Sequence, residues 1–329
     1  MTTLKGVVRS YGAAVRRMER EQQRQAREAA KRFKEQQKQE AIADAKQAVE
    51  DWKNYINMLQ SVHKNCTDHI NWDEIKNIPK PIEPNKITNN EDSVQYKLDK
   101  YKPSFLDKIL GSSQKKVGKL ESLLEKAKQT DIQEYNTVFE QYTQELDGWN
   151  TLQKMAQGVD DKNPEAYKDT LEYFDPFSDI GELGGHLSFS FESSYVDIDL
   201  HINCKEIIPD YELKQTSTGK LSRKNMAKSK FNELYQDHIC SAIIRVARET
   251  FAYLPVEYVR VNAMTKLLNS KTGHLKDEAI LSVIMPPETI DSLNLETIDP
   301  SDSMQNFVHN MKFKKTNGFG AVEKVELNK

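Results

Sequence analysis

An uninterrupted amphipathic repeat dominates the start of the chain, because the first 78 residues contain no proline. Apolar side chains recur there at alternating steps of four and three, first at Leu4, Val8, Tyr11, Val15 and Met18, and again at Val49, Trp52, Ile56 and Leu59. This spacing keeps them on one face of a helix. It predicts a helix of about 50 to 60 residues, roughly 80–90 Å long at 1.5 Å per residue.

A second amphipathic run begins near Gln114 and continues to Leu152. Four prolines separate it from the first run, at positions 79, 81, 84 and 103, and proline does not fit inside a helix. Residues 79–103 are therefore expected to form a proline-rich linker region, with a short helix after residue 92. The simplest arrangement is a coiled-coil-like hairpin, in which the second helix packs antiparallel on the first. Pairing of either helix with a second copy of the chain satisfies the same pattern.

The hydrophobic period changes to two after His186. Residues 186–192 and 195–202 alternate strictly between apolar and polar side chains, and Ser193 and Ser194 separate them. The pattern predicts a β-hairpin with a two-residue turn. This register pairs Phe191 with Val196 and places His186 opposite His201, with one apolar face and one polar face.

The remaining pattern predicts a compact domain with both helices and strands. Further strands are expected at 206–213, 256–263 and 279–285, and a long helix at about 227–253. The predicted fold class is α+β: a mixed or antiparallel sheet of four to five strands, packed by one long helix. We place the helical region at 1–157 and the α+β domain at 158–329.

The chain has the composition of a soluble protein of a reducing cytoplasm. Its three cysteines are odd in number and widely spaced, which does not indicate a disulfide framework. No apolar stretch reaches the 18 residues of a membrane span. The start lacks the apolar core of a signal peptide, so a cytoplasmic location is predicted.

A metal-dependent nuclease is the most specific catalytic hypothesis. One nuclease core carries an Asp on its second strand and Glu-x-Lys on its third, where the acids hold Mg²⁺ or Mn²⁺ and the lysine helps to activate water. Asp197 and Asp199 lie on the second predicted strand, and Glu212 and Lys214 follow. The alternative is that both aspartates belong to the solvated face of the hairpin. No other cofactor is predicted.

Two other groups of residues are candidates for binding. His186 and His201 share the polar face of the hairpin with the aspartates, an alternative metal site. Basic residues gather in two stretches, which suit phosphate groups of a nucleic acid or another ligand. The first contains Lys220, Arg223, Lys224, Lys228 and Lys230, and the second, in the N-terminal helix, contains Arg16, Arg17, Arg20 and Arg24.

These observations favour a non-enzymatic assembly or interaction protein. Its helices would associate with each other or with a partner protein, and its α+β domain would recognise a phosphate-bearing ligand. The alternatives are the nuclease and a nucleic-acid-binding module without catalysis. A charged coil joined to a small α+β domain is typical of accessory proteins of bacterial mobile elements and phage-defence loci, an analogy of architecture that does not establish function.

Overall fold

The computed structural model describes residues 31–32, 35–105, 112–178, 185–202, 207–268 and 272–327. The chain divides into two compact units. The first, called the sheet unit, consists of the described residues up to Asp68, of Asp175–Ala252 and of the described residues from Val256 onward. The second, called the helical unit, consists of His69–Phe174 and Tyr253–Pro255.

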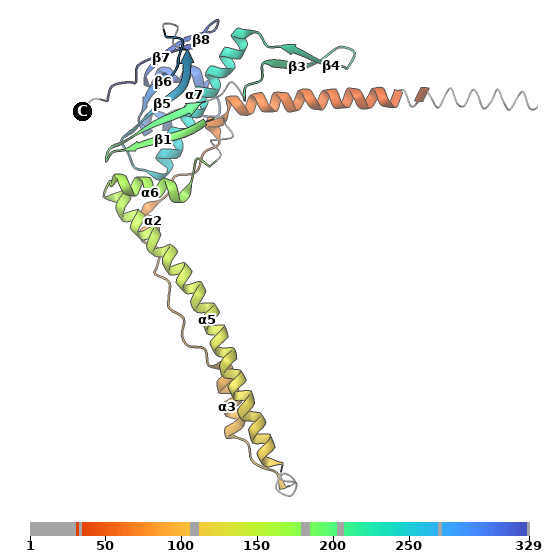
Figure 1. Ribbon diagram of the computed structural model, residues 1–329, viewed down its shortest axis with the longest axis vertical. Helices are drawn as coiled ribbons and strands as arrows, with labels where there is room; N and C mark the ends of the chain where they lie inside the picture. Colours follow the sequence, from red (N-terminus) through yellow and green to blue (C-terminus); the bar gives the residue numbers. More distant parts are fainter. Residues whose placement is uncertain are drawn as a thin grey trace, which may run out of the picture. The chain divides into compact units, whose positions relative to one another are not determined.

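A mixed six-stranded sheet forms the centre of the sheet unit (Figure 1). Its strands follow the order β1-β2-β5-β6-β7-β8. β2 and β5 are parallel, and the other neighbours are antiparallel. The strands are β1 Gly185–Phe191, β2 Tyr195–Ile202, β5 Tyr258–Leu268, β6 Leu275–Met285, β7 Val308–Lys314 and β8 Gly318–Gly320. The predicted α+β fold class is confirmed.

The β1–β2 hairpin has the register that the alternation predicts. Phe191 pairs with Val196, and His186 pairs with His201. Along β2, burial alternates residue by residue, and Val196, Ile198 and Leu200 are buried. The opposite face of β2 therefore presents its polar side chains.

One long helix, α7 Lys228–Tyr253, supplies the other half of the core. Its apolar side chains recur at helical spacing, and Ile239, Ile243 and Val246 are fully buried. Buried residues of β5 and β6, including Val261 and Ile280, belong to the same core. Pro255, which cannot continue a helix, lies shortly after the end of α7.

A separate two-stranded sheet lies in the connection between β2 and α7. It consists of β3 Tyr211–Gln215 and β4 Leu221–Asn225, and we call it the basic ribbon. The sequence predicts a single strand ending near residue 213, and the second strand escaped prediction because its residues are almost all polar. Near the tip, Gln215 Nε2 donates to the Ile42 carbonyl at 3.0 Å, so the ribbon contacts the helix that the structure describes over residues 35–60.

The sheet has more strands than the four to five predicted, because the end of the chain adds β7 and β8. Asp299 caps a helix of four residues, α9 Pro300–Ser303, and accepts from the Ser301 and Asp302 amides. A 3-10 turn, Met304–Asn306, leads into β7. On the inward side of β7, Met311 and Phe313 are the large apolar residues. Two such residues are too few for an alternating pattern that predicts a strand. A short helix, α8 Pro287–Asp291, follows β6.

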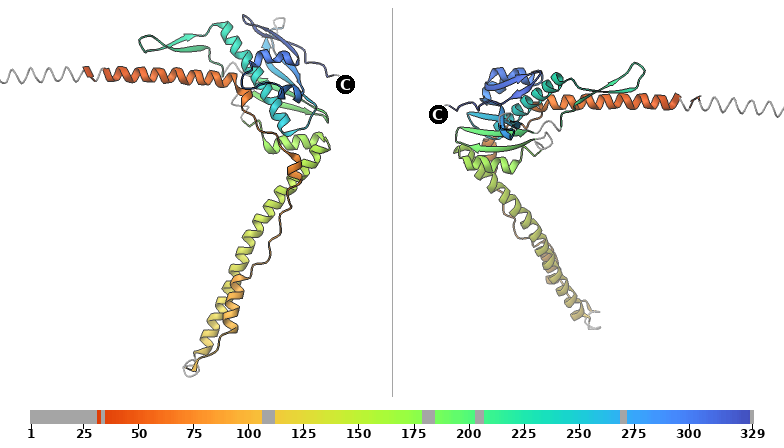
Figure 2. Two further views of the ribbon diagram at one scale, coloured as in Figure 1. Left: turned by 180° about the vertical axis from the view of Figure 1, so that it is seen from behind. Right: turned by 45° about the horizontal axis from the view of Figure 1, so that its top comes forward.

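The helical unit contains an antiparallel pair of helices, which can be followed in both views of Figure 2. α3 Asn89–Asp99 packs along α5 Ser113–Asp160, and Asp131 of α5 accepts the amides of Asn90 (3.1 Å) and Glu91 (2.7 Å). The helix that pairs with α5 is therefore α3, whereas the sequence pattern suggested that the N-terminal helix would pair with it. α2 Trp72–Lys76 and α6 Pro164–Phe174 complete the unit.

The N-terminal helix ends in the sheet unit, where a 3-10 turn, Val62–Lys64, follows it. Within the described part of the chain, no helix has both the length and the apolar character needed to cross a bilayer.

Replacing Ile280 with Ala should lower the free energy of unfolding of the sheet unit by about 2–5 kcal/mol, because a fully buried side chain leaves a cavity. Leu275→Ala on the same strand is the matched control, since its side chain is 65% exposed. It should change stability by less than about 0.5 kcal/mol. Urea unfolding followed by circular dichroism measures both, and equal effects would contradict the assigned core.

Candidate functional site

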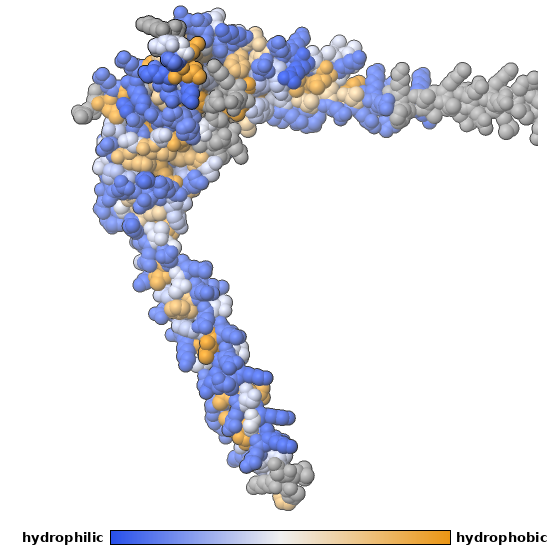
Figure 3. Space-filling view, viewed as in Figure 1, coloured by the Kyte–Doolittle hydropathy of each residue, from blue (hydrophilic) through white to orange (hydrophobic). Residues whose placement is uncertain are grey.

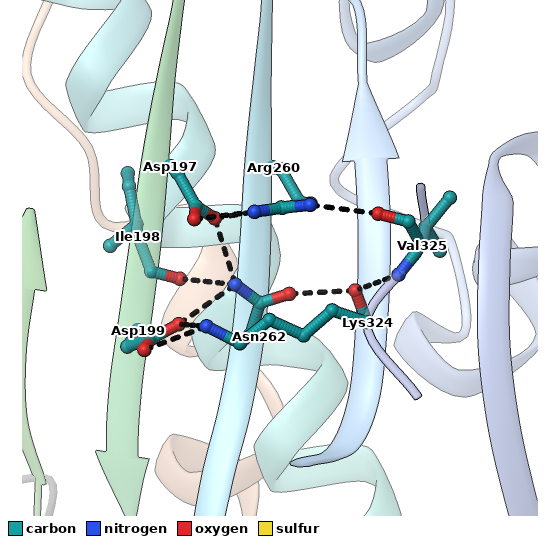
Figure 4. A network of polar contacts seen from close by, with 8 residues as sticks. Asp197, Ile198, Asp199, Arg260, Asn262, Lys324 and Val325 are labelled. Carbon is teal, nitrogen blue, oxygen red and sulfur yellow. Dashed lines mark hydrogen bonds and ion pairs between the residues drawn. The ribbon is translucent and has the colours of Figure 1, made fainter. Parts of the chain in front are cut away.

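The polar face of β2 carries the two aspartates that the sequence selects as catalytic candidates, and both are bound to cations (Figure 4). Arg260 lies directly across from Asp197 on β5. Its Nε donates to Asp197 Oδ1 at 2.8 Å, and its Nη2 donates to Oδ2 at 2.6 Å. This two-point geometry is the strongest form of a carboxylate–guanidinium contact.

A buried asparagine connects the two aspartates. Asn262 has no exposed surface, and its Nδ2 donates to Asp197 Oδ1 at 2.9 Å and to Asp199 Oδ1 at 2.8 Å. Its Oδ1 accepts from Ser282 Oγ on β6 at 2.6 Å. The side chain thus has partners for both its donor and its acceptor, as a buried amide requires.

The C-terminal segment closes this network. Lys324 Nζ lies 2.6 and 2.8 Å from the two carboxylate oxygens of Asp199. The next residue, Val325, donates its amide to Ser282 Oγ (2.9 Å) and accepts from Arg260 Nη1 (2.8 Å). The segment is therefore fixed across β2, β5 and β6 by side chains of all three strands.

The electrostatics of the cluster are balanced, since two carboxylates meet two cations. Burial opposes ionisation of Asp197, but the hydrogen bonds and charge of Arg260 outweigh it, with help from Asn262 and Lys324. The pKa of Asp197 therefore lies below its ordinary value. An aspartate held in this way serves better as an anchor than as a metal ligand or a base.

Glu212 and Lys214 lie on the basic ribbon, whose strands pair only with each other in the described structure. Glu212 binds Lys230 of α7 and also lies 3.4 Å from Lys214. The hydrogen bond from Lys230 is the main cause of its lowered pKa. The structure thus brings Glu212 and Lys214 together, but in a different sheet from Asp197 and Asp199.

Of the alternative metal site, the structure brings the two histidines together. The rings of His186 and His201 stack with centroids 4.5 Å apart, across the predicted register. Among the residues whose positions are described, no group of three or more His, Cys, Asp or Glu side chains is arranged to hold a metal ion.

The predicted phosphate-binding residues of the α+β domain cluster on the ribbon and the start of α7. Lys220 lies at the tip, Arg223 and Lys224 lie on β4, and Lys228 and Lys230 open α7. All five are exposed. The candidates of the N-terminal helix, Arg16, Arg17, Arg20 and Arg24, fall outside the described residues.

Sequence reasoning missed the partners of the aspartates. Arg260 and Asn262 alternate with Val259, Val261 and Ala263 on β5, so the alternation itself was a signal of a polar face. Lys324 carried no such signal, because it follows the last strand and reaches Asp199 only through the fold.

A pocket of about 770 Å³ also escaped prediction. Trp52, Phe313 and Leu234 supply apolar lining. Its charged residues are four acids and two lysines: Glu233, Asp237, Asp299, Asp302, Lys230 and Lys315. Burial and the neighbouring charges of Asp299 and Glu233 raise the pKa of Asp237. Because four acids outnumber two lysines in the lining, the pocket suits a phosphate group less well than the ribbon does.

Comparisons with models of protein families, with curated proteins and with solved structures found no match to this chain. The function is therefore argued from the geometry alone.

Asp197→Asn should destabilise the sheet unit at neutral pH, because Arg260 then lacks its ion pair. A carboxyl group whose pKa is lowered by folding stabilises the folded state fully at pH values above its unfolded pKa, which lies near the ordinary 3.8. This stabilisation is lost as the pH falls through the folded pKa. The stability difference between parent and variant should therefore shrink below about pH 3.8. Thermal melts across an acid series test this, with exposed Asp277→Asn as the matched control; a constant difference would contradict the assignment.

Proposed function

We propose that this chain is a non-enzymatic assembly and interaction protein whose sheet unit recognises a phosphate-bearing ligand through the basic ribbon and the start of α7. The helices provide association with a further chain. The observation that carries the proposal is the outward face of the ribbon, where lysines gather around a single glutamate.

Residues paired across β3 and β4 share a face of the ribbon. Tyr211, Leu213 and Gln215 share one face with their partners, and Gln215 contacts the helix at Ile42. The other face therefore presents Lys214 and Lys224, beside which Lys230 of α7 reaches Glu212. Three lysines around one carboxylate leave a positive surface.

The charge of the whole segment agrees with this. Residues 210–230 contain six basic and two acidic side chains, an excess of four positive charges. Lysine and arginine that neutralise phosphates release condensed counterions, which supplies most of non-specific affinity for nucleic acid. The ribbon offers this charge on exposed side chains, so a polyphosphate backbone can reach it.

Arg223 pairs with Leu213 and so lies on the other face of the ribbon from Lys214 and Lys224, where it offers a second, preorganised cation. Its guanidinium lies over the Tyr211 ring, 3.7 Å from the centroid. Stacking on a ring holds the guanidinium plane and leaves its edges open for hydrogen bonds. A flat, oriented fork suits two oxygens of a phosphate.

The nuclease hypothesis has less support from the geometry. Arg260 and Lys324 bind the two aspartates, and Lys230 and Lys214 bind Glu212. A nuclease with Mg²⁺ or Mn²⁺ would have to break these pairs and bring two sheets together. Binding of nucleic acid without catalysis, in contrast, needs only the ribbon.

Fluorescence anisotropy with a labelled DNA duplex, a DNA single strand and an RNA tests the proposal. Binding should weaken steeply with salt. The double variant Lys214→Ala/Lys224→Ala should reduce the slope of log K against log salt by up to about 1.8 on duplex DNA, since each lost phosphate contact removes roughly 0.9. Lys276→Ala is the matched control, because Lys276 is an exposed lysine of β6, which belongs to the six-stranded sheet and not to the ribbon.

A cleavage assay on the same substrates with Mg²⁺ or Mn²⁺ separates binding from catalysis. We expect intact substrate for the parent and for Asp199→Ala. Metal-dependent cleavage by the parent that Asp199→Ala abolishes would establish the nuclease instead. Binding to none of the probes at low salt would refute recognition of nucleic acid by the ribbon.

A further inference from the structure

The two faces of the basic ribbon differ in polarity. Residues that pair across β3 and β4 lie on the same face of a two-stranded sheet. One face, the inner face, consists of Tyr211, Leu213, Gln215, Leu221, Arg223 and Asn225. The other, the outward face, consists of Glu212, Lys214, Ser222 and Lys224. The inner face thus contains three large apolar side chains, whereas every side chain of the outward face is polar.

The inner face packs on the N-terminal helix, which is described over residues 35–60. Near the tip of the ribbon, Gln215 Nε2 donates to the Ile42 carbonyl at 3.0 Å. Just before β3, the Ile207 carbonyl accepts from Tyr55 Oη of the same helix at 2.6 Å. The outward face therefore points away from this helix. Figure 3 shows blue, hydrophilic residues and a few orange, hydrophobic ones where the ribbon of Figure 1 lies.

The outward face presents positive charge. Lys214 and Lys224 are exposed, and Lys224 lies directly across from Glu212. Both Lys214 and Lys230 of α7 bind Glu212, whose side chain is only 14% exposed. The one carboxylate of this face is therefore neutralised within the chain, so it does not repel an anionic ligand. Ser222 adds a small hydroxyl that leaves the surface between the lysines low.

The dimensions of the ribbon suit the major groove of B-form DNA. Its two strands lie about 4.8 Å apart, and five residues of strand extend about 17 Å. The major groove is about 12 Å wide and 8.5 Å deep, and it admits a two-stranded ribbon. The minor groove is only about 6 Å wide. An RNA duplex has a deep, narrow major groove that side chains cannot read, so shape favours DNA over RNA.

We propose that the outward face of the basic ribbon docks into the major groove of double-stranded DNA. There Lys214 and Lys224 face the bases, and the O6 and N7 acceptors of guanine are the usual partners of lysine. Lys220 at the tip and Lys228 at the start of α7 are exposed beyond the two ends of the ribbon, where they contact flanking phosphates. The inference rests on the proposed function and adds the partner, its B form and the groove.

Fluorescence anisotropy of the full chain with duplexes altered in one groove is the first test. Glucosylated 5-hydroxymethylcytosine at every cytosine fills the major groove, whereas inosine at every guanine removes an amino group from the minor groove alone. We expect binding to the glucosylated duplex to be roughly ten-fold weaker than to unmodified DNA, and binding to the inosine duplex to change by less than about two-fold. An RNA duplex of the same sequence should also bind roughly ten-fold more weakly.

A variant connects the groove to the outward face. Lys224→Ala should reduce the difference between the unmodified and glucosylated duplexes from about ten-fold to about three-fold, because a side chain that faces the bases is lost. Lys276→Ala, on β6 of the six-stranded sheet, should leave the difference unchanged. Circular dichroism checks that both variants are folded.

Methylation by dimethyl sulfate locates the groove directly, because it modifies guanine N7 in the major groove and adenine N3 in the minor groove. The bound protein should protect guanine N7 and leave adenine N3 reactive. Equal affinity for the unmodified and glucosylated duplexes, or protection of adenine N3 alone, would overturn docking in the major groove and leave phosphate recognition by the ribbon standing. Equal affinity for the RNA duplex would overturn the preference for the B form. Binding to none of the duplexes at low salt would overturn both proposals.

Discussion

The parallel pairing of β2 with β5 is the contact on which the sheet unit depends. It brings Asp197 opposite Arg260 and Asp199 opposite Asn262 on one face, while Val196, Ile198, Val259 and Val261 enter the core on the other. Parallel neighbours need a long crossover connection, and α7 provides it. Because a parallel pair is normally covered on both faces, the polar face needs a cover of its own. The C-terminal segment supplies it through Lys324 and Val325.

This arrangement explains why residues with catalytic chemistry need not be catalytic. Acids, a guanidinium, an amide and a hydroxyl gather here as they do in active sites, but each has its partner within the chain. The contacts within such a network offset the cost of removing its charges from water, and they select one position for the terminal segment. Among the described residues, the basic ribbon carries exposed charge that an external ligand can reach. Function is therefore better sought on this surface than on the polar face of β2.

The hydrophobic period predicted a helix or strand well where the two faces of that element differ in polarity. The β1–β2 register followed from strict alternation, and α7 was placed within one residue of its start. β4, β7 and β8 were missed because their sequences are short and polar, so their strands exist only through the partners that they pair with. A short helix was expected after residue 92, but its pairing with α5 was missed, because α3 carries a weak apolar stripe and its start is fixed by the carboxylate of Asp131.

The sequence by itself determined the local periods, and with them the α+β class, the hairpin register and the candidate acids and bases. Those properties depend on neighbours within a few residues, which the chain order supplies directly. Tertiary structure alone decided which partners the acids have. Arg260 and Asn262 lie more than sixty residues from Asp197, and Lys324 lies 125 residues from Asp199. Whether an aspartate is an open ligand or a closed ion pair depends on which distant cation the fold brings to it, and no local pattern contains that information.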